Sequence, residues 1–333
     1  MISRRRFLAI AGLAGAAGYA AWRAWPEQGV FNPCLGPLPD ALANHALVRE
    51  AWAGLDPAQV WDAHVHLLGD GGNDADAWFN DGRDTWRWPL AATQRQFFLD
   101  ASCLEGDTPT DADYIARLTT LAQSFPAGYR MLLLALDAYY DAAGTLQRER
   151  THFYLGNDYC HRVAQAAPAR FEWAASVHPY RSDATAELER VHGLGARAVK
   201  WIPAAQGIDP AAPRCDPFYE TLARLDLPLL SHAGTERATP GDDALSNPLL
   251  LRRAIEHGVR VVVAHCATMG QGRDLDVGEH GPWIDNFSLF ERMMDTATSA
   301  GRLYGDLSAV TQTARAGKAL TRIVERASEG GDW

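Results

Sequence analysis

Seven predicted strands that alternate with helical patterns constrain the fold of this chain more than any other feature of its sequence. One of them, Arg130–Asp137, contains the run Met131–Leu136, which is apolar at every position, as expected of a strand buried on both faces. Strands that alternate with helices predict a parallel sheet covered by those helices. The predicted strands are Val60–Leu67, Arg130–Asp137, Phe171–His178, Ala196–Ile202, Leu227–His232, Arg260–His265 and Arg302–Leu307.

The chain is long enough for one large α/β domain. It has 333 residues, of which 47% are hydrophobic and 22% charged, and this composition excludes a disordered, collagen-like or coiled-coil protein. A barrel of eight strands and eight helices needs about 250 residues. We therefore predict a (β/α)8 TIM barrel over residues 59–333 that ends before its eighth strand. The expected helices are Ala112–Gln123, Asp158–Ala166, Asp183–Leu194, Asp216–Arg224, Pro248–His257, Phe287–Ala300 and Ala316–Ala327.

The first 25 residues resemble an export signal. The motif Ser3-Arg4-Arg5-Arg6-Phe7-Leu8 matches the bacterial twin-arginine pattern, and a short apolar segment rich in glycine and alanine completes it over residues 7–22. We expect the twin-arginine export machinery to carry the folded protein to the periplasm. Because no small-x-small cleavage site precedes Trp22, the segment could also stay uncleaved and anchor the chain to the outer face of the inner membrane. Residues 26–58 then form an N-terminal extension.

The net charge and the cysteine content of the chain limit the classes of ligand and metal site that it can have. The net charge of −10 disfavours a sequence-independent nucleic-acid binder, because the phosphate backbone requires a basic face. We expect a small-molecule substrate and no nucleic acid, and a homo-oligomer remains open. Five cysteines, an odd number, leave at least one thiol free or bound to metal, and the lack of a C-x-x-C pair argues against a cysteine zinc site. Cys34 is the best candidate for one disulfide partner.

Two histidines lie near the end of the first predicted strand. His64 and His66 are separated by one residue, so in a strand both point to the same side, together with Asp62. Two imidazoles that face a barrel axis can bind one divalent metal. The segment Gly69–Pro109, which follows this strand and is rich in glycine, aspartate and tryptophan, is expected to cover the active site.

The same placement recurs on later strands, and this recurrence strengthens the prediction. His232 and His265 each end a predicted strand, and Asp306 lies near the end of the seventh. Lys200 lies within the fourth predicted strand, where an unpaired lysine is costly to bury. Barrels keep their catalytic residues at the C-terminal ends of their strands. These residues therefore predict one active site at that face.

With its His64-Val65-His66 motif, its strand-end histidines and Lys200, the chain resembles the amidohydrolase superfamily, in the branch of metal-dependent hydrolases with a TIM-barrel fold. The resemblance covers residues 58–333. It implies that His64, His66 and His232 bind metal. It further implies that His265 binds a second metal or activates water and polarises the substrate. The implied cofactor is a divalent metal, zinc in the first place, as one or two ions.

Two further positions follow from the resemblance. In some members a fourth-strand lysine is carboxylated and bridges two metals, which implies this role for Lys200; a substrate-carboxylate binder and a paired barrel lysine are the alternatives. The family's acid is an aspartate that ends the eighth strand and accepts a proton from water. Here Asp306 ends the seventh predicted strand. Either Asp306 is this acid and a strand has been missed, or the chain ends before that strand, which the count favours.

Three functions are compatible with these residues. The first is a metal-dependent hydrolase that directs a metal-activated water at a small ester, lactone, amide or phosphoester, with His265 and Asp306 as catalytic residues. The second is a non-oxidative decarboxylase, a class in the same branch of the family, which periplasmic export makes less favourable. The third is a truncated, catalytically inactive barrel. In the active forms His178, which ends the third predicted strand, and Arg181 could line the pocket and bind substrate.

Overall fold

A computed structural model describes residues 40–69, 76–80, 102, 111–237, 239–296, 299, 301–312, 315–331 and 333. The chain divides into two compact units, residues 1–51 with 81–124 and residues 52–80 with 125–333. The predicted signal, Cys34 and most of the predicted cover Gly69–Pro109 lie outside the described residues. None of the described helices is long and apolar enough to span a membrane.

The first unit is helical in its described part. It contains α2 (Asp40–Ala43), α5 (Asp111–Gln123) and most of α3 (Ala46–Trp52). Asp111 and Asp113 lie in the first turn of α5, where acidic side chains stabilise the positive end of the helix dipole. The predicted helix Ala112–Gln123 is therefore confirmed to within one residue.

The second unit is built on parallel strands that are neighbours in space in the order of the chain. Seven strands form two sheets, and a parallel bridge between Ala175 and Val199 joins the two. The α/β class and the seven predicted strands are thereby confirmed, and described residues 306–333 contain no eighth strand. The sheets comprise β1 (Trp61–His66), β3 (Arg130–Leu134) and β5 (Phe171–Ala174), and β6 (Val199–Trp201), β7 (Leu229–His232), β8 (Val261–Ala264) and β11 (Leu303–Gly305).

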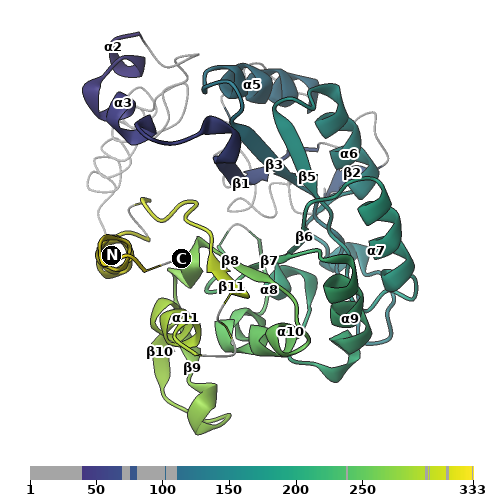
Figure 1. Ribbon diagram of the computed structural model, residues 1–333. Helices are drawn as coiled ribbons and strands as arrows, with labels where there is room; N and C mark the ends of the chain where they lie inside the picture. Colours follow the sequence, from purple (N-terminus) through teal and green to yellow (C-terminus); the bar gives the residue numbers. More distant parts are fainter. Residues whose placement is uncertain are drawn as a thin grey trace, which may run out of the picture. The chain divides into compact units, whose positions relative to one another are not determined.

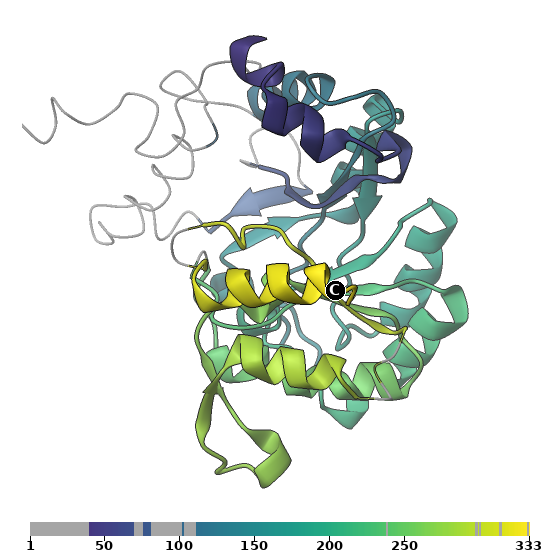
Figure 2. The same cartoon turned by 60° about the vertical axis from the view of Figure 1, so that its left-hand side comes forward.

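Helices lie on the outer side of these strands (Figure 1). They are α6 (Asn157–Ala166), α7 (Ala184–Gly193), α9 (Asp216–Leu225), α10 (Arg252–Glu256), α11 (Asn286–Met294) and α12 (Lys318–Ser328). The short α8 (Pro203–Gln206) instead follows the C-terminal end of β6 and is mostly buried. Figure 2 shows α12 alongside α11, where Arg326 forms an ion pair with Asp295 at 2.8 Å. The prediction of one helix over Phe287–Ala300 was too long, because Thr296 donates its hydroxyl to the carbonyl of Met293 at the end of α11.

Several short elements were not predicted. The antiparallel pairs are β2 (Ala77–Phe79) with β4 (Phe153–Leu155), and β9 (Gln271–Arg273) with β10 (Trp283–Asp285). The 3-10 turns are η1 (Pro57–Gln59), η3 (Arg148–Arg150), η4 (Pro213–Cys215), η5 (Asp243–Ser246), η6 (Pro248–Leu251), η7 (His265–Ala267) and η8 (Leu275–Val277). The first half of the predicted helix Pro248–His257 is the turn η6, because the side chain of Asn247 accepts the N–H of Leu249 and proline occupies the next position.

The strands enclose an aliphatic core. Its members share the inward-facing side of the strands: Leu132, Leu134, Ala174, Ala198, Leu230 and Ala264. Because side chains alternate along a strand, Lys200 and His232 point to the same side as Ala198 and Leu230, two residues further toward the C-terminal ends. The polar residues of the barrel therefore form a layer above this apolar one. The described cysteines, Cys160, Cys215 and Cys266, are buried and free.

Candidate metal and active site

The two histidines of β1 face each other. The Nε2 atoms of His64 and His66 lie 3.1 Å apart, so both rings point to the same side, as predicted. The strand is irregular here: its pairing with β3 shifts register between Asp62 and Val65, and the Asp62 carboxylate accepts the N–H of His64 at 3.0 Å. Asp62 thus fixes the backbone that carries the first histidine.

His64 also contacts the carboxylate that follows the last strand. Its Nδ1 lies 2.7 Å from Oδ2 of Asp306, and the two side chains are only 3% and 6% exposed. Burial and the charge of Lys200 hold the pKa of His64 well below its usual value, so the ring is neutral. A neutral ring next to a carboxylate donates its Nδ1–H, which leaves a lone pair on Nε2, directed at His66. Asp306 therefore fixes the tautomer of His64.

Asp306 is held as a carboxylate. Burial alone would raise its pKa, but the hydrogen bond from His64, together with two hydrogen bonds from Ser308, lowers the pKa below its ordinary value. The hydroxyl of Ser308 donates to Oδ2 at 2.5 Å, and its backbone N–H donates to Oδ1 at 2.8 Å. The acid that follows the seventh strand thus lies in the site, ionised and oriented.

Ser308 connects Asp306 to His265. The Nδ1 of His265 lies 2.9 Å from the carbonyl oxygen of Ser308 and 2.8 Å from its hydroxyl. Donation of Nδ1–H to that carbonyl leaves a lone pair on Nε2 of His265, in addition to the one on Nε2 of His64. Sequence reasoning missed Ser308, although a serine two residues after a strand-end aspartate is typical of a local side-chain turn.

The backbone is strained where it carries His265. His265, Cys266 and Ala267 have φ values of 55°, 49° and 51°, a left-handed conformation that side chains other than glycine rarely adopt. Such strain is stored at functional sites and is tolerated only where the surroundings enforce it. Here Gly305 of β11 makes room for the turn, because a Cβ at that position would lie 2.6 Å from the Cys266 sulfur.

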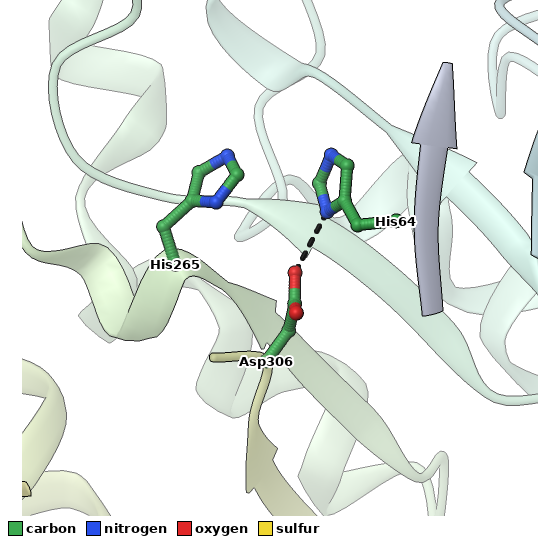
Figure 3. A group of neighbouring side chains, drawn as sticks. All are labelled: His64, His265 and Asp306. Carbon is green, nitrogen blue, oxygen red and sulfur yellow. Dashed lines mark hydrogen bonds and ion pairs between the residues drawn. The ribbon is translucent and has the colours of Figure 1, made fainter. Parts of the chain in front are cut away.

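These donors can hold a divalent ion. Two ligands each about 2.0–2.1 Å from a tetrahedral zinc ion are separated by about 3.3 Å, close to the 3.1 Å between the two Nε2 atoms of β1. The Nε2 of His232 is buried and has no hydrogen-bond partner in the part of the chain that the structure describes. Ligand atoms of His64, His265 and Asp306 also lie within 4.8 Å of one another (Figure 3). Imidazole and carboxylate donors of this kind suit zinc and similar metals.

The family follows from the sequence as a whole. A family model described as amidohydrolase matches residues 61–329, which is most of the chain and nearly all of the second unit. This chain belongs to the amidohydrolase family. No curated protein matched the sequence.

Solved structures similar to this amidohydrolase have low sequence identity. An uncharacterized TIM-barrel protein from Bordetella bronchiseptica is 16% identical, with a TM-score of 0.48 and 80% of each chain covered. A putative 2-pyrone-4,6-dicarboxylic acid hydrolase from Pseudomonas putida is 15% identical, with a TM-score of 0.37, 81% of this chain and 90% of that chain covered. The 5-carboxyvanillate decarboxylase of Sphingomonas paucimobilis is 16% identical, with a TM-score of 0.35, and the match covers 62% of this chain and 68% of that chain. Similarities at this level do not select a reaction.

Lys200 lies in the site of this amidohydrolase, as its position in the fourth strand predicts. It is 1% exposed, and its Nζ lies 3.5 Å from Nε2 of His64. Burial lowers the pKa of Lys200 to about 8. A fraction of the amine is therefore unprotonated near neutral pH, the form that reacts with carbon dioxide. His232, on the next strand, has its Nδ1 3.3 Å from a carboxylate oxygen of Glu236, which sequence reasoning also missed.

His178 and Arg181 are engaged elsewhere. His178 is fully buried, donates from Nε2 to the carbonyl of Gln206 at 2.9 Å and accepts the N–H of Tyr180 at Nδ1. Burial lowers the pKa of His178 to about 3. Arg181 pairs with Asp137 at 3.1 Å and with an exposed aspartate, and it lines a polar cavity of about 280 Å³. Neither residue makes a hydrogen bond to the described site histidines, so their role in substrate binding stays a prediction.

Proposed function

We propose that this amidohydrolase is a metal-dependent hydrolase that cleaves a small ester, lactone, amide or phosphoester. The observation that carries the proposal is the pair of Nε2 atoms of His64 and His66, 3.1 Å apart, with the proton of His64 committed to Asp306 on its other nitrogen. This arrangement directs unprotonated nitrogens at one point and keeps a carboxylate next to it. Ligand histidines are commonly oriented by a carboxylate in this way.

His64, His66 and His232 would hold the ion, and zinc is the first choice. An ion bound there would lower the pKa of a water molecule and polarise the carbonyl or phosphoryl oxygen of the substrate. Lys200, 3.5 Å from His64, would bridge a second ion once carboxylated. The orphaned, buried Nε2 of His232 supports its place in this set, because an unpaired polar atom is costly to bury.

Asp306 and His265 would then move and orient protons. The carboxylate of Asp306, ionised at neutral pH, accepts the proton of the attacking water. His265 keeps its Nδ1–H on the carbonyl of Ser308, so its Nε2 can accept a hydrogen bond and orient water or substrate. Ser308 keeps the two groups at a fixed separation.

The ion could alternatively lie between His64, His265 and Asp306. The mutual distances of their ligand atoms, all within 4.8 Å, favour this second arrangement. The two arrangements share His64; the first adds His66 and His232, and the second adds His265 and Asp306. Truncation of each histidine in turn therefore distinguishes them.

The test is metal content, measured by elemental mass spectrometry on protein purified without chelators. We expect about one or two equivalents of a divalent metal in the wild type, loss of metal and turnover in His64→Ala, loss of metal in His66→Ala, and retained metal in His265→Ala and in the exposed control His192→Ala. Metal lost from His265→Ala but kept in His66→Ala supports the second arrangement. Unchanged metal in His64→Ala refutes both.

Two other outcomes would replace this proposal. Release of carbon dioxide from an aromatic or unsaturated acid would identify a decarboxylase. A folded sample that takes up no metal when resupplied would identify an inactive barrel. From the motif Ser3–Leu8 we further propose twin-arginine export, with the enzyme in the periplasm or anchored to the outer face of the inner membrane.

A further inference from the structure

Arg315 is a half-buried cation with two unpaired buried nitrogens among the described residues. It lies in the segment between β11 and α12, and its Nε and Nη1 are both buried with no hydrogen-bond partner among the described residues. Most other arginines near acidic groups here are paired, as Arg292 is with Asp274 at 2.5 Å. A guanidinium stays charged in proteins, so burial of its N–H groups without hydrogen-bond acceptors costs folding free energy. Such a cost is typically retained where a ligand supplies the missing acceptor.

The loop that carries Arg315 begins at the metal site. Ser308, seven residues earlier, contacts both Asp306 and His265, and the N–H of Arg315 donates to the carbonyl of Gln312 in the turn that follows. Burial chiefly lowers the pKa of His232 to about 3 and the pKa of His265 to about 4, and the charges of Lys200 and Arg315 lower both further. The guanidinium therefore acts on the rings of the site.

The neighbouring acids are already engaged. Asp306 is held by His64 and Ser308, and Glu236 lies against His232. Both attract Arg315 electrostatically, yet neither accepts a hydrogen bond from its Nε or Nη1. A guanidinium whose Nε and Nη1 lack acceptors beside these acids matches a monoanion better than a dianion, because the second negative charge of a dianion would face the carboxylates.

We propose that Arg315 binds a carboxylate of the substrate beside the metal site. This inference rests on the proposed function, and it narrows the substrate to a small ester, lactone or amide that also bears a carboxylate. Guanidinium–carboxylate hydrogen bonds are charge-assisted and directional, so Arg315 would hold the substrate in one orientation relative to Asp306. Arg315 is then a binding residue and not a metal ligand.

The experiment uses the full chain, with benzoate as the carboxylate probe and benzamide as its neutral counterpart of the same shape. Calorimetric affinity and the thermal midpoint are measured for the wild type, Arg315→Gln, Arg315→Lys and Arg237→Gln. The last is a control, because Arg237 is an exposed arginine whose charge also acts on Arg315. Metal content is measured in every sample, and each titration is repeated on metal-free protein.

We expect benzoate to bind and stabilise the wild type, benzamide to bind far more weakly, and Arg315→Gln to weaken benzoate about tenfold or more. Arg315→Lys should retain part of the affinity, and Arg237→Gln should change it less than about twofold. Without benzoate, Arg315→Gln should unfold at the same or a higher temperature than the wild type, since a buried unpaired cation is removed. Metal content should not differ between the variants.

Four results would overturn the inference. They are no benzoate binding to the wild type, equal affinity in Arg315→Gln, equal weakening by Arg237→Gln, and inorganic phosphate that binds more tightly than benzoate with the same dependence on Arg315. Benzoate binding that depends on the metal and not on Arg315 would also refute the inference, because the metal ion would then be the anion-binding site. If the wild type holds no metal, the proposed function fails, but benzoate binding to the metal-free chain still decides the role of Arg315.

Discussion

At the scale of single residues, one serine determines how two functional groups are oriented. Ser308 donates its hydroxyl to Asp306 and accepts the Nδ1–H of His265 on its carbonyl oxygen, so it fixes the carboxylate and the ring tautomer together. No other described residue contacts both groups by hydrogen bonds. Ser308 acts through its neighbours and is therefore a positioning residue.

Ser308→Ala should impair the enzyme without removing its metal. Loss of the hydroxyl removes a hydrogen bond that lowers the pKa of Asp306, so that pKa should rise. Because the ionised carboxylate is the active form, the acid limb of the kcat/KM profile should move to higher pH, and turnover should fall about 10–100-fold. Ser328→Ala, at an exposed serine of α12, is the control. An unchanged acid limb would show that Ser308 has no positioning role.

The sequence predicts some residues of the site and not others. His64, His66, Lys200, His232 and His265 could be predicted because strand period and strand ends determine where they point. Ser308 and Glu236 could not be predicted, because they reach the site through the paths of loops, which no periodicity describes. The structure also places His178 among backbone partners, a satisfied environment that its position at a strand end does not reveal.

At the scale of elements, β8 and β11 act as one unit. They pair in parallel from Leu303 with Val261 to Gly305 with Val263, and each is followed at once by a site residue. The strained turn after β8 packs its Cys266 sulfur against the glycine that ends β11. The fit between a left-handed turn and a residue without a side chain therefore aligns His265 with Asp306.

Gly305→Ala should disrupt this fit. The added Cβ would meet the Cys266 sulfur at 2.6 Å and the Phe290 ring at 3.3 Å, both in the core. Overpacking of this kind costs about 1–3 kcal/mol of unfolding free energy, and displacement of β11 should also weaken metal binding. Urea unfolding and metal titration measure the two effects. Gly193→Ala, where no atom lies within 4 Å of the new Cβ, is the control. Equal stability of both variants would contradict the argument.

The elements themselves were largely predictable from the sequence. All seven parallel strands lie within the segments predicted for them, and the clearest is β3, because a strand buried on both faces is continuously apolar. The strands of the pairs β2–β4 and β9–β10 have three residues each, which is too short to show an alternation of apolar and polar residues. The twin-arginine segment and Cys34 lie outside the described residues, so these interpretations stay predictions.

At the scale of the second unit, the site joins the first strand of the series to the last. The described residues show no backbone pairing between β1 and β11. The hydrogen bond of His64 to Asp306 links residues 242 positions apart in the chain. A metal ion on these side chains would add its binding free energy to the same link, because the unfolded chain offers no preformed site. Function and closure of the strand series therefore depend on the same residues.

The metal-free protein should lose stability steeply in mild acid. His178, His232 and His265 have pKa values of about 3, 3 and 4 in the folded chain, chiefly because they are buried. The unfolded chain has histidine pKa values of about 6.5, so it binds more protons between that pH and about 4. The stability that the neutral rings contribute is complete above pH 6.5 and is lost as the pH falls toward their folded values. Each proton contributes a slope of about 1.4 kcal/mol per pH unit. Urea midpoints from pH 7.5 to about 4.5 measure the sum, and His178→Gln should remove one proton from the slope while the exposed control His192→Gln should not. A flat profile over this range would show that these rings are protonated in the folded protein.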